Sequence, residues 1–175
     1  KGFGDLPSSE FHGKVESLGA SLTPAISREY SGFYLTGLTQ NLPEVLKMTN
    51  QLICKPNFRQ EELDKERKLA LDDLRSIDDD PFQSASLILR EIMYGEHPYG
   101  RPIIGANNSL PEIEIAHLEN HYRQSITTEN LYIVAAGDIN AEELADQLSE
   151  ELATLPTRKP PAIGDLTNIR QPAGT

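Results

Sequence analysis

The sequence predicts an α+β fold in which helices pack on one face of a mainly antiparallel or mixed sheet. Two observations carry this prediction. Apolar residues recur at helical spacing over most of the chain, whereas extended segments are few. Two of these segments follow one another early, and a third, Leu131–Gly137, comes late. Because helices and strands do not alternate regularly, a doubly wound sheet is not expected.

The expected helices have clear start and stop signals. Six segments combine helical spacing with a capping residue or a proline, and they cover residues 8–18, 41–55, 56–81, 81–94, 109–122 and 140–155. Ser8 or Ser9 can cap the first, and Gly19 can end it. Asp80 is expected to cap the fourth, with Gln83 completing a capping box. The early strands are expected at residues 21–26 and 29–38. Leu131–Gly137 is a continuous apolar run, typical of a central strand covered on both faces.

The length and charge of the chain limit its organisation and partners. A chain of 175 residues is long enough for one core, so we expect a single domain over residues 1–160 and a linker toward a following domain over residues 161–175. Because the chain opens with Lys1, it is interpreted as a piece of a longer product, incomplete at its N-terminal end. A formal charge of −11 argues against nucleic acid or an anionic membrane as a partner. Cys54 is the single cysteine, so an intrachain disulfide is excluded, and the compartment stays open.

The charged helix expected at residues 56–81 carries two neighbouring acids with different surroundings. At 100° per residue, one apolar stripe collects Leu63, Ala70, Leu74 and Ile77. Asp72 falls on the opposite, solvated side, whereas Asp73 lies roughly 60° from the middle of the stripe. Asp73 is therefore expected to be half-buried and hydrogen-bonded, ion-paired or bound to a metal, because an isolated buried carboxylate is costly.

His117 and His121 have the i, i+4 spacing of a helical zinc site. The acid between them is wrongly placed, because Glu119 lies roughly 200° around the helix from His117 and could not activate a metal-bound water that both histidines share. The apolar side of this helix is formed by Ile115, Leu118 and Tyr122. We therefore expect both histidines on a solvated face, with a functional metal there as the alternative.

Two further side chains could take part in chemistry. His97 lies in the glycine-bounded loop Gly95–Gly100, where a His-Pro-Tyr segment more often orders a loop than performs catalysis. Cys54 paired with a histidine could act as a nucleophile, but no nucleophile-elbow motif surrounds it, and packing in a helix is the preferred interpretation.

Several short segments occur in an order that is specific over about 145 residues, although none is diagnostic alone. They are residues 18–22, 55–58, 61–67, 79–81, 94–102, Gly105, 130–138 and 142–143. In this order the chain from Leu18 to Asp165 resembles a single domain of the pitrilysin/insulinase family of zinc metallopeptidases, which includes mitochondrial processing peptidase and its non-peptidase relatives.

This resemblance implies an architecture and a zinc site. In the family, similar domains of one chain, or two paired chains, enclose a peptide between them. Catalytic domains carry an inverted His-x-x-Glu-His motif on the helix just before the segment at which this chain begins, and a glutamate further along as third zinc ligand. The glutamate position falls on Asp73, which is shorter by about 1.5 Å, whereas ligand distances to zinc are acceptable only within roughly 0.2 Å.

No residue of this chain is assigned a catalytic or metal-binding role on these grounds. The inverted motif is absent from all 175 residues, and His12 has no partner histidine near it. Zinc is expected only in a catalytic partner domain, and the expected partners are a sister domain or subunit of the same family and an extended peptide.

The preferred hypothesis is a non-catalytic domain that contributes to peptide binding and chamber closure with a catalytic partner domain. The strand beginning at Ser21 or at Tyr30 is the candidate edge for an extended peptide. One alternative is a catalytic half whose motif lies upstream of Lys1 and whose third ligand is Asp73. A second is a structural assembly subunit. The substrate stays open.

Overall fold

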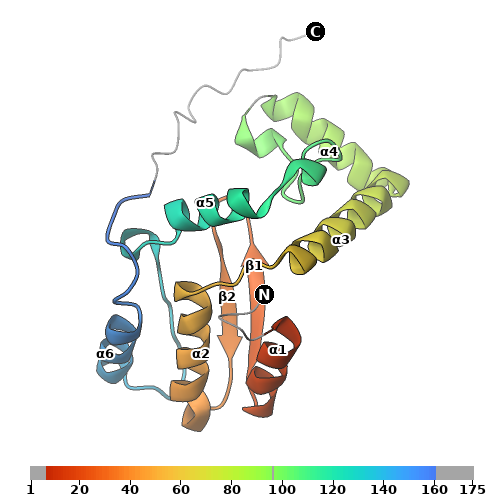
Figure 1. The fold of residues 1–175 in the computed structure, drawn as a ribbon. Helices are drawn as coiled ribbons and strands as arrows, with labels where there is room; N and C mark the ends of the chain where they lie inside the picture. The colour runs from red at the N-terminus through yellow and green to blue at the C-terminus, as the bar shows by residue number, and fades with distance from the viewer. Residues whose placement is uncertain (1–6, 96, 161–175) are drawn as a thin grey trace. The chain divides into compact units, whose positions relative to one another are not determined.

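The computed structural model describes residues 7–95 and 97–160, and it is mostly helical with one small antiparallel sheet of two strands (Figure 1). The predicted α+β class is confirmed. The described residues form two compact units. The first contains residues 7–25, 31–59 and 116–160, and the second contains residues 26–30, 60–95 and 97–115. A single domain over residues 1–160 stays a prediction, and the predicted linker, residues 161–175, lies outside the described residues.

Helices and a β-hairpin build the first unit. Its elements, including end residues shared with the second unit, are α1 (Ser8–Ser17), β1 (Ser21–Ile26), β2 (Ser31–Thr36), η1 (Thr39–Asn41), α2 (Leu42–Cys54), α5 (Ile115–Ser125), η4 (Thr128–Asn130) and α6 (Ala141–Glu151). The hairpin between β1 and β2 closes where the amide of Ser27 donates to the carbonyl of Tyr30 at 2.8 Å. Both expected early strands are present, the second shortened to six residues.

A small apolar core joins α1, β1 and α2 in this unit. Its buried members are Phe11, Val15, Ala20, Leu22 and Val45. The chain reverses after α1 at Gly19, whose φ of +65° is the left-handed conformation that glycine adopts without strain. Neither Ser8 nor Ser9 caps α1, because both lie inside the helix and Pro7 occupies the N-cap position without a side-chain hydrogen bond.

Two long helices dominate the second unit. Its elements are α3 (Gln60–Asp79), α4 (Pro81–Tyr94), η2 (Pro98–Gly100) and η3 (Leu110–Glu112). Asp80 caps α4 as predicted, since its carboxylate accepts from the amides of Phe82 and Gln83 at 2.9 and 3.2 Å. The capping box is not formed: Gln83 Nε2 donates to the Asp80 carboxylate at 2.8 Å, and the Asp80 amide donates to the carbonyl oxygen of Ile77 at 3.1 Å. The hydrogen bonds to its carboxylate hold the pKa of Asp80 below its usual value, and the bond from the Gln83 side chain has the largest effect. α3 contacts α4 and η3, and Leu74 is its buried residue.

The apolar run Leu131–Gly137 does not form the central strand that its composition predicts. The segment passes from η4 to α6 without strand structure, as Figure 1 shows, and its residues make no backbone hydrogen bond to other described residues. Tyr132 and Val134 are 87% and 94% exposed. A buried strand needs a neighbour on each edge, and the strands of the described residues, β1 and β2, pair with each other.

The starts of two helices also differ from the sequence pattern. The charged helix begins at Gln60 rather than at Pro56, and the helix expected from Ser109 is preceded by η3 and begins at Ile115. Pro111 lies in η3, and the extended conformation of Ile113 separates it from α5. No helix in the described ranges combines the length and the apolarity needed to cross a bilayer.

Candidate functional site

α3 places Asp73 on its surface rather than beside a buried stripe. The stripe itself is as expected, because Leu74 is buried and Leu63, Ala70 and Ile77 are half-buried. Asp73 is exposed, and within the described residues it has no hydrogen bond or ion pair. The prediction of a half-buried, partnered acid is therefore wrong.

The reason lies in the residues around Asp73. Leu69, one turn before it, is itself 50% exposed, so the apolar stripe does not extend to this side of α3. The helical wheel fixes the direction of the side chain but not what covers it. Asp72 is exposed as predicted, and it accepts a hydrogen bond from Arg75 Nη1 at 2.8 Å.

The histidine pair lies on the surface of α5, as predicted. His117 and His121 are exposed, and Glu119 instead pairs with Arg123 at 2.8 Å. On the opposite side of this helix the Tyr122 hydroxyl donates to the carbonyl oxygens of Ile53 and Cys54, at 2.7 and 3.1 Å. Burial, with a smaller contribution from Cys54, raises the pKa of Tyr122. Cys54 is partly buried at the end of α2, with its sulfur 3.8 Å from the carbonyl oxygen of Glu151, in line with a packing role.

In the second unit, the loop around His97 is fastened to the turn of the β-hairpin. Arg28 Nη1 donates to the carbonyl oxygen of Arg101 at 2.7 Å, and the Tyr99 hydroxyl donates to Glu29. The bond to Glu29 is the main reason why the pKa of Tyr99 is raised. His97 Nδ1 accepts from the amide of Tyr99 at 3.1 Å, so His97 orders this loop, as its sequence context predicts.

A pocket of about 430 Å³ lies beside this loop, within the second unit. Its lining residues come from the hairpin turn, α4 and the loop, and they are Arg28, Ser86, Leu89, Arg90, Met93, Tyr94 and Tyr99. Sequence reasoning did not single out Arg28 or Arg90. The sequence gives only a weak indication of this pocket, because the two arginines are far apart in a strongly acidic chain and only one of them lies in a tight turn.

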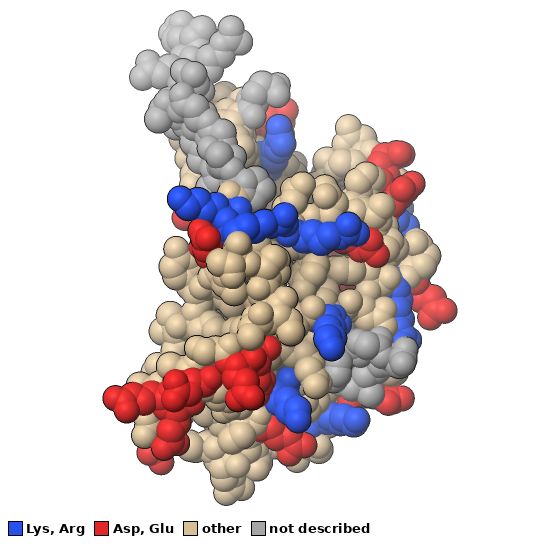
Figure 2. All heavy atoms as spheres, turned by 60° about the vertical axis from the view of Figure 1, so that its left-hand side comes forward, with Lys and Arg blue, Asp and Glu red and all other residues tan. Residues whose placement is uncertain are grey.

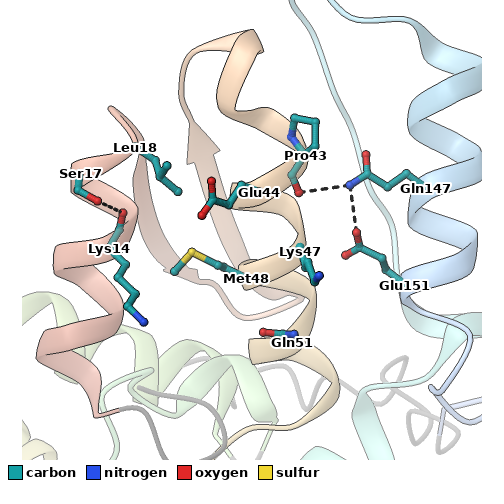
Figure 3. Close-up of a pocket in the computed structure, with 10 residues that line it drawn as sticks. All are labelled: Lys14, Ser17, Leu18, Pro43, Glu44, Lys47, Met48, Gln51, Gln147 and Glu151. Atoms are coloured by element: carbon teal, nitrogen blue, oxygen red, sulfur yellow. Dashed lines mark hydrogen bonds between the residues drawn. The ribbon is translucent and has the colours of Figure 1, made fainter.

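A larger pocket of about 800 Å³ lies in the first unit, along α1, α2 and α6 (Figure 3). In this view Lys14 and Met48 border the space between α1 and α2, while Gln147 bridges α2 and α6. The Gln147 amide donates to the carbonyl oxygen of Pro43 at 3.3 Å and to Glu151 Oε1 at 3.0 Å. The lining mixes lysines, carboxylates and amides, and it contains no nucleophile with an adjacent base.

Acidic side chains gather over α6, where Figure 2 shows a band of Asp and Glu residues. This helix carries Glu142, Glu143, Asp146, Glu150 and Glu151. Its N-terminus is capped as predicted, since Asn140 accepts from the amides of Glu142 and Glu143 at 3.0 and 3.3 Å. The acidic band is local, because the same view in Figure 2 also shows Lys and Arg side chains on this face.

The described side chains do not fit a zinc site of the kind that the family implies. Across residues 7–95 and 97–160, no three or more His, Cys, Asp or Glu side chains are grouped so that they could hold a metal ion. Asp73 is exposed on α3 and belongs to no such group among the described residues.

Comparison with known proteins identifies the family. The profile of the family described as Insulinase (Peptidase family M16) matches residues 2–107, which is more than half of the chain. An uncharacterized zinc protease of Mycobacterium bovis is 23% identical over 140 residues, 80% of this chain and 32% of that protein. Subunit beta of the mitochondrial-processing peptidase of Neurospora crassa is 20% identical over 159 residues, 91% of this chain and 33% of that protein.

A solved structure shares this fold. The crystal structure of a peptidase M16 inactive domain from Pseudomonas fluorescens superposes with a TM-score of 0.87 at 24% identity, over 98% of this chain and 41% of that chain. The chain spans about a third of the length of the curated relatives it matches. From the profile match and the order of its elements, the chain belongs to the insulinase family of peptidases, peptidase family M16.

Proposed function

We propose that this chain is a non-catalytic domain of a zinc metallopeptidase, which binds extended peptide and closes a chamber together with a catalytic sister domain or subunit. The observation that carries the proposal is Asp73. At the position of the family's third zinc ligand the chain has a shorter acid, which is exposed and unpartnered within the described residues. The sequence also contains no His-x-x-Glu-His.

The relatives support a role in an assembly. The Pseudomonas fluorescens structure is described as an inactive domain, and the Neurospora crassa relative is named as a subunit. A domain without metal ligands can still form part of the chamber surface and contact the peptide. Both roles depend on the fold rather than on a bound metal.

The hairpin supplies the peptide-binding element in this proposal. β1 and β2 pair with each other, so within the described residues each strand has one unpaired edge. An extended peptide can add to such an edge through backbone hydrogen bonds. In β1, Leu22 is buried while Ser21 and Thr23 are exposed, which fixes one face of the strand against the core. The register of β1 is therefore set before any peptide binds.

The test measures zinc and peptidase activity in the full 175-residue chain. We expect no stoichiometric zinc after incubation with zinc and dialysis, and no cleavage of an unstructured peptide, both in the parent chain and in Asp73→Glu. Asp72→Ala, which removes the neighbouring acid, is the matched control for Asp73→Ala. One tightly held zinc per chain that Asp73→Ala abolishes and Asp72→Ala retains would overturn the proposal in favour of a catalytic half.

Peptide binding is measured separately, by fluorescence anisotropy with an unstructured, labelled peptide. The proposed domain binds this peptide without cleaving it. Absence of binding would instead favour a structural assembly subunit, the alternative that needs no peptide contact.

A further inference from the structure

The pocket beside the hairpin turn is cationic in a chain whose formal charge is −11. Arg28 and Arg90 both line it, and its lining includes no aspartate or glutamate. The neighbouring acid, Glu29, is hydrogen-bonded by Tyr99 rather than by either arginine. Neither guanidinium has an ion pair within the described residues. Two like charges therefore line one cavity, and among the described residues neither has an acidic partner.

The two arginines differ in how they are held. Arg28 is positioned by the bond from Nη1 to the carbonyl oxygen of Arg101, while its Nη2 is buried and has no hydrogen-bond partner within residues 7–95 and 97–160. The charge of this buried guanidinium is less well solvated than that of an exposed one, and an anion in the pocket would stabilise it electrostatically. Arg90, on α4, is half-buried and makes no hydrogen bond within the described residues. Arg90 is thus the arginine that can contact a ligand, and Arg28 adds a fixed positive charge behind it.

The remaining walls select the shape of a ligand. Leu89 and Met93 give the pocket an apolar side, and both are largely exposed. Tyr94 and Tyr99 stack edge to face with ring centroids 5.8 Å apart, which forms a rigid aromatic side. A planar anion on a short apolar stem fits this combination, because guanidinium groups pair with carboxylates in a fixed planar geometry.

We propose that this pocket binds a carboxylate of an extended peptide. The inference rests on the proposed peptide binding and specifies which peptides are preferred. The carboxylate can belong to an acidic side chain or to the peptide C-terminus, since both present the same group on an aliphatic stem.

The test uses the full chain and four labelled peptides of one parent sequence in a binding assay. The first carries an internal glutamate and a C-terminal amide, the second replaces that glutamate by glutamine, and the third has the glutamine and a free C-terminal carboxylate. The fourth has both carboxylates. We expect the carboxylate-bearing peptides to bind about tenfold more tightly than the neutral one, as for a charge-assisted hydrogen bond, and this preference to weaken as salt rises.

Two variants assign the preference to the pocket. Arg90→Gln removes a guanidinium with no partner within the described residues, so the fold should persist while the carboxylate preference is lost. Arg28→Gln should also lower the preference for carboxylate-bearing peptides. Because this variant loses the bond to the carbonyl oxygen of Arg101, its thermal stability is measured as well. Arg75→Gln is the matched control, because it removes the same charge from an exposed position on α3.

The outcomes separate this inference from the proposed function. Binding of all four peptides with equal affinity, or a carboxylate preference that survives in Arg90→Gln, would overturn the carboxylate pocket and leave peptide binding intact. Binding of none of them would remove the proposed function as well. Tighter binding of the first peptide than of the third, or the reverse, identifies whether the pocket takes a side-chain or a C-terminal carboxylate.

Discussion

The two compact units are stabilised in different ways. The first has a core of fully buried apolar side chains, with Phe11 and Val15 each 1% exposed. In the second unit the buried apolar side chains of the described residues are few, Leu74 on α3 and Leu110 in η3. Much of its order comes from polar contacts instead. Arg67 donates to the carbonyl oxygens of Leu110 and Ile113 at 3.2 and 2.5 Å.

The difference indicates where function can reside. Burial of apolar area is the main favourable term in folding, so the first unit supplies a stable scaffold. A unit held by hydrogen bonds can expose much of its apolar surface, and α4 does so at Phe82, Ile88, Leu89 and Ile92. Such exposed apolar area is typical of surfaces that contact another protein. The second unit therefore offers an apolar surface on α4 for contacts with a sister domain, in addition to the hairpin edge of the first unit.

The largest effect in this comparison is expected from Phe11→Ala. Phe11 is fully buried in the first unit, and truncation of a buried phenylalanine costs about 3–5 kcal/mol through lost burial and the cavity left behind. Phe82→Ala is the matched control, because Phe82 is 82% exposed on α4 and its removal should change stability little. Urea denaturation of both variants measures the difference. Equal losses of unfolding free energy would show that Phe82 contributes as much to stability as Phe11, which would contradict this comparison.

Tyr122→Phe tests a polar contact inside the first unit. The variant keeps the ring packed on Phe58, at a centroid distance of 5.9 Å, but loses the donor to the carbonyl oxygens of Ile53 and Cys54. We expect a loss of about 1 kcal/mol at neutral pH. Tyr132→Phe, at an exposed position in the same unit, should cost nothing measurable.

The same tyrosine predicts a dependence on alkaline pH. Burial raises the pKa of Tyr122 in the folded chain, so the neutral phenol is favoured by folding. The contribution of the neutral Tyr122 side chain to the unfolding free energy is fully present below the unfolded pKa of about 10. It is lost as pH rises through the folded pKa. The difference in unfolding free energy between the parent and Tyr122→Phe should therefore shrink above about pH 10. A difference that grows with pH would contradict this assignment.

Local signals in the sequence predicted local structure well. The caps at Asp80 and Asn140 and the stop at Gly19 depend on a few neighbouring residues, and all three are present. The burial of Asp73 and the strand at Leu131–Gly137 depend on which distant segments cover them, and both predictions were wrong. The pocket at Arg28 and Arg90 joins residues from a turn and a helix that share no sequence pattern. Family membership was predictable because it rests on the order of many local motifs.

Asp80→Ala tests a polar contact of the second unit. Its carboxylate caps α4 and bonds Gln83, so the variant should lower the thermal midpoint, by less than Phe11→Ala does. Because these bonds hold the pKa of Asp80 low in the folded chain, the stabilisation is present above the unfolded pKa of about 3.9 and is lost as pH falls through the folded pKa. The difference in stability between the parent and the variant should therefore shrink in strong acid. Asp80→Asn, which keeps an acceptor, should retain most of the cap at all pH values.

The smallest effect is expected from the double variant His117→Ala with His121→Ala. Both side chains are exposed on α5, and substitutions at exposed positions usually change stability by less than about 0.5 kcal/mol. The thermal midpoint and peptide affinity should match the parent, and alanine, the best helix former, should offset any lost contact. Addition of zinc provides the sharper readout, because two histidines one turn apart can capture the ion weakly. Two results together would contradict this prediction: zinc raises the thermal midpoint of the parent but not of the double variant, and the double variant loses peptide binding. They would show that the histidine pair is a functional metal site in the first unit.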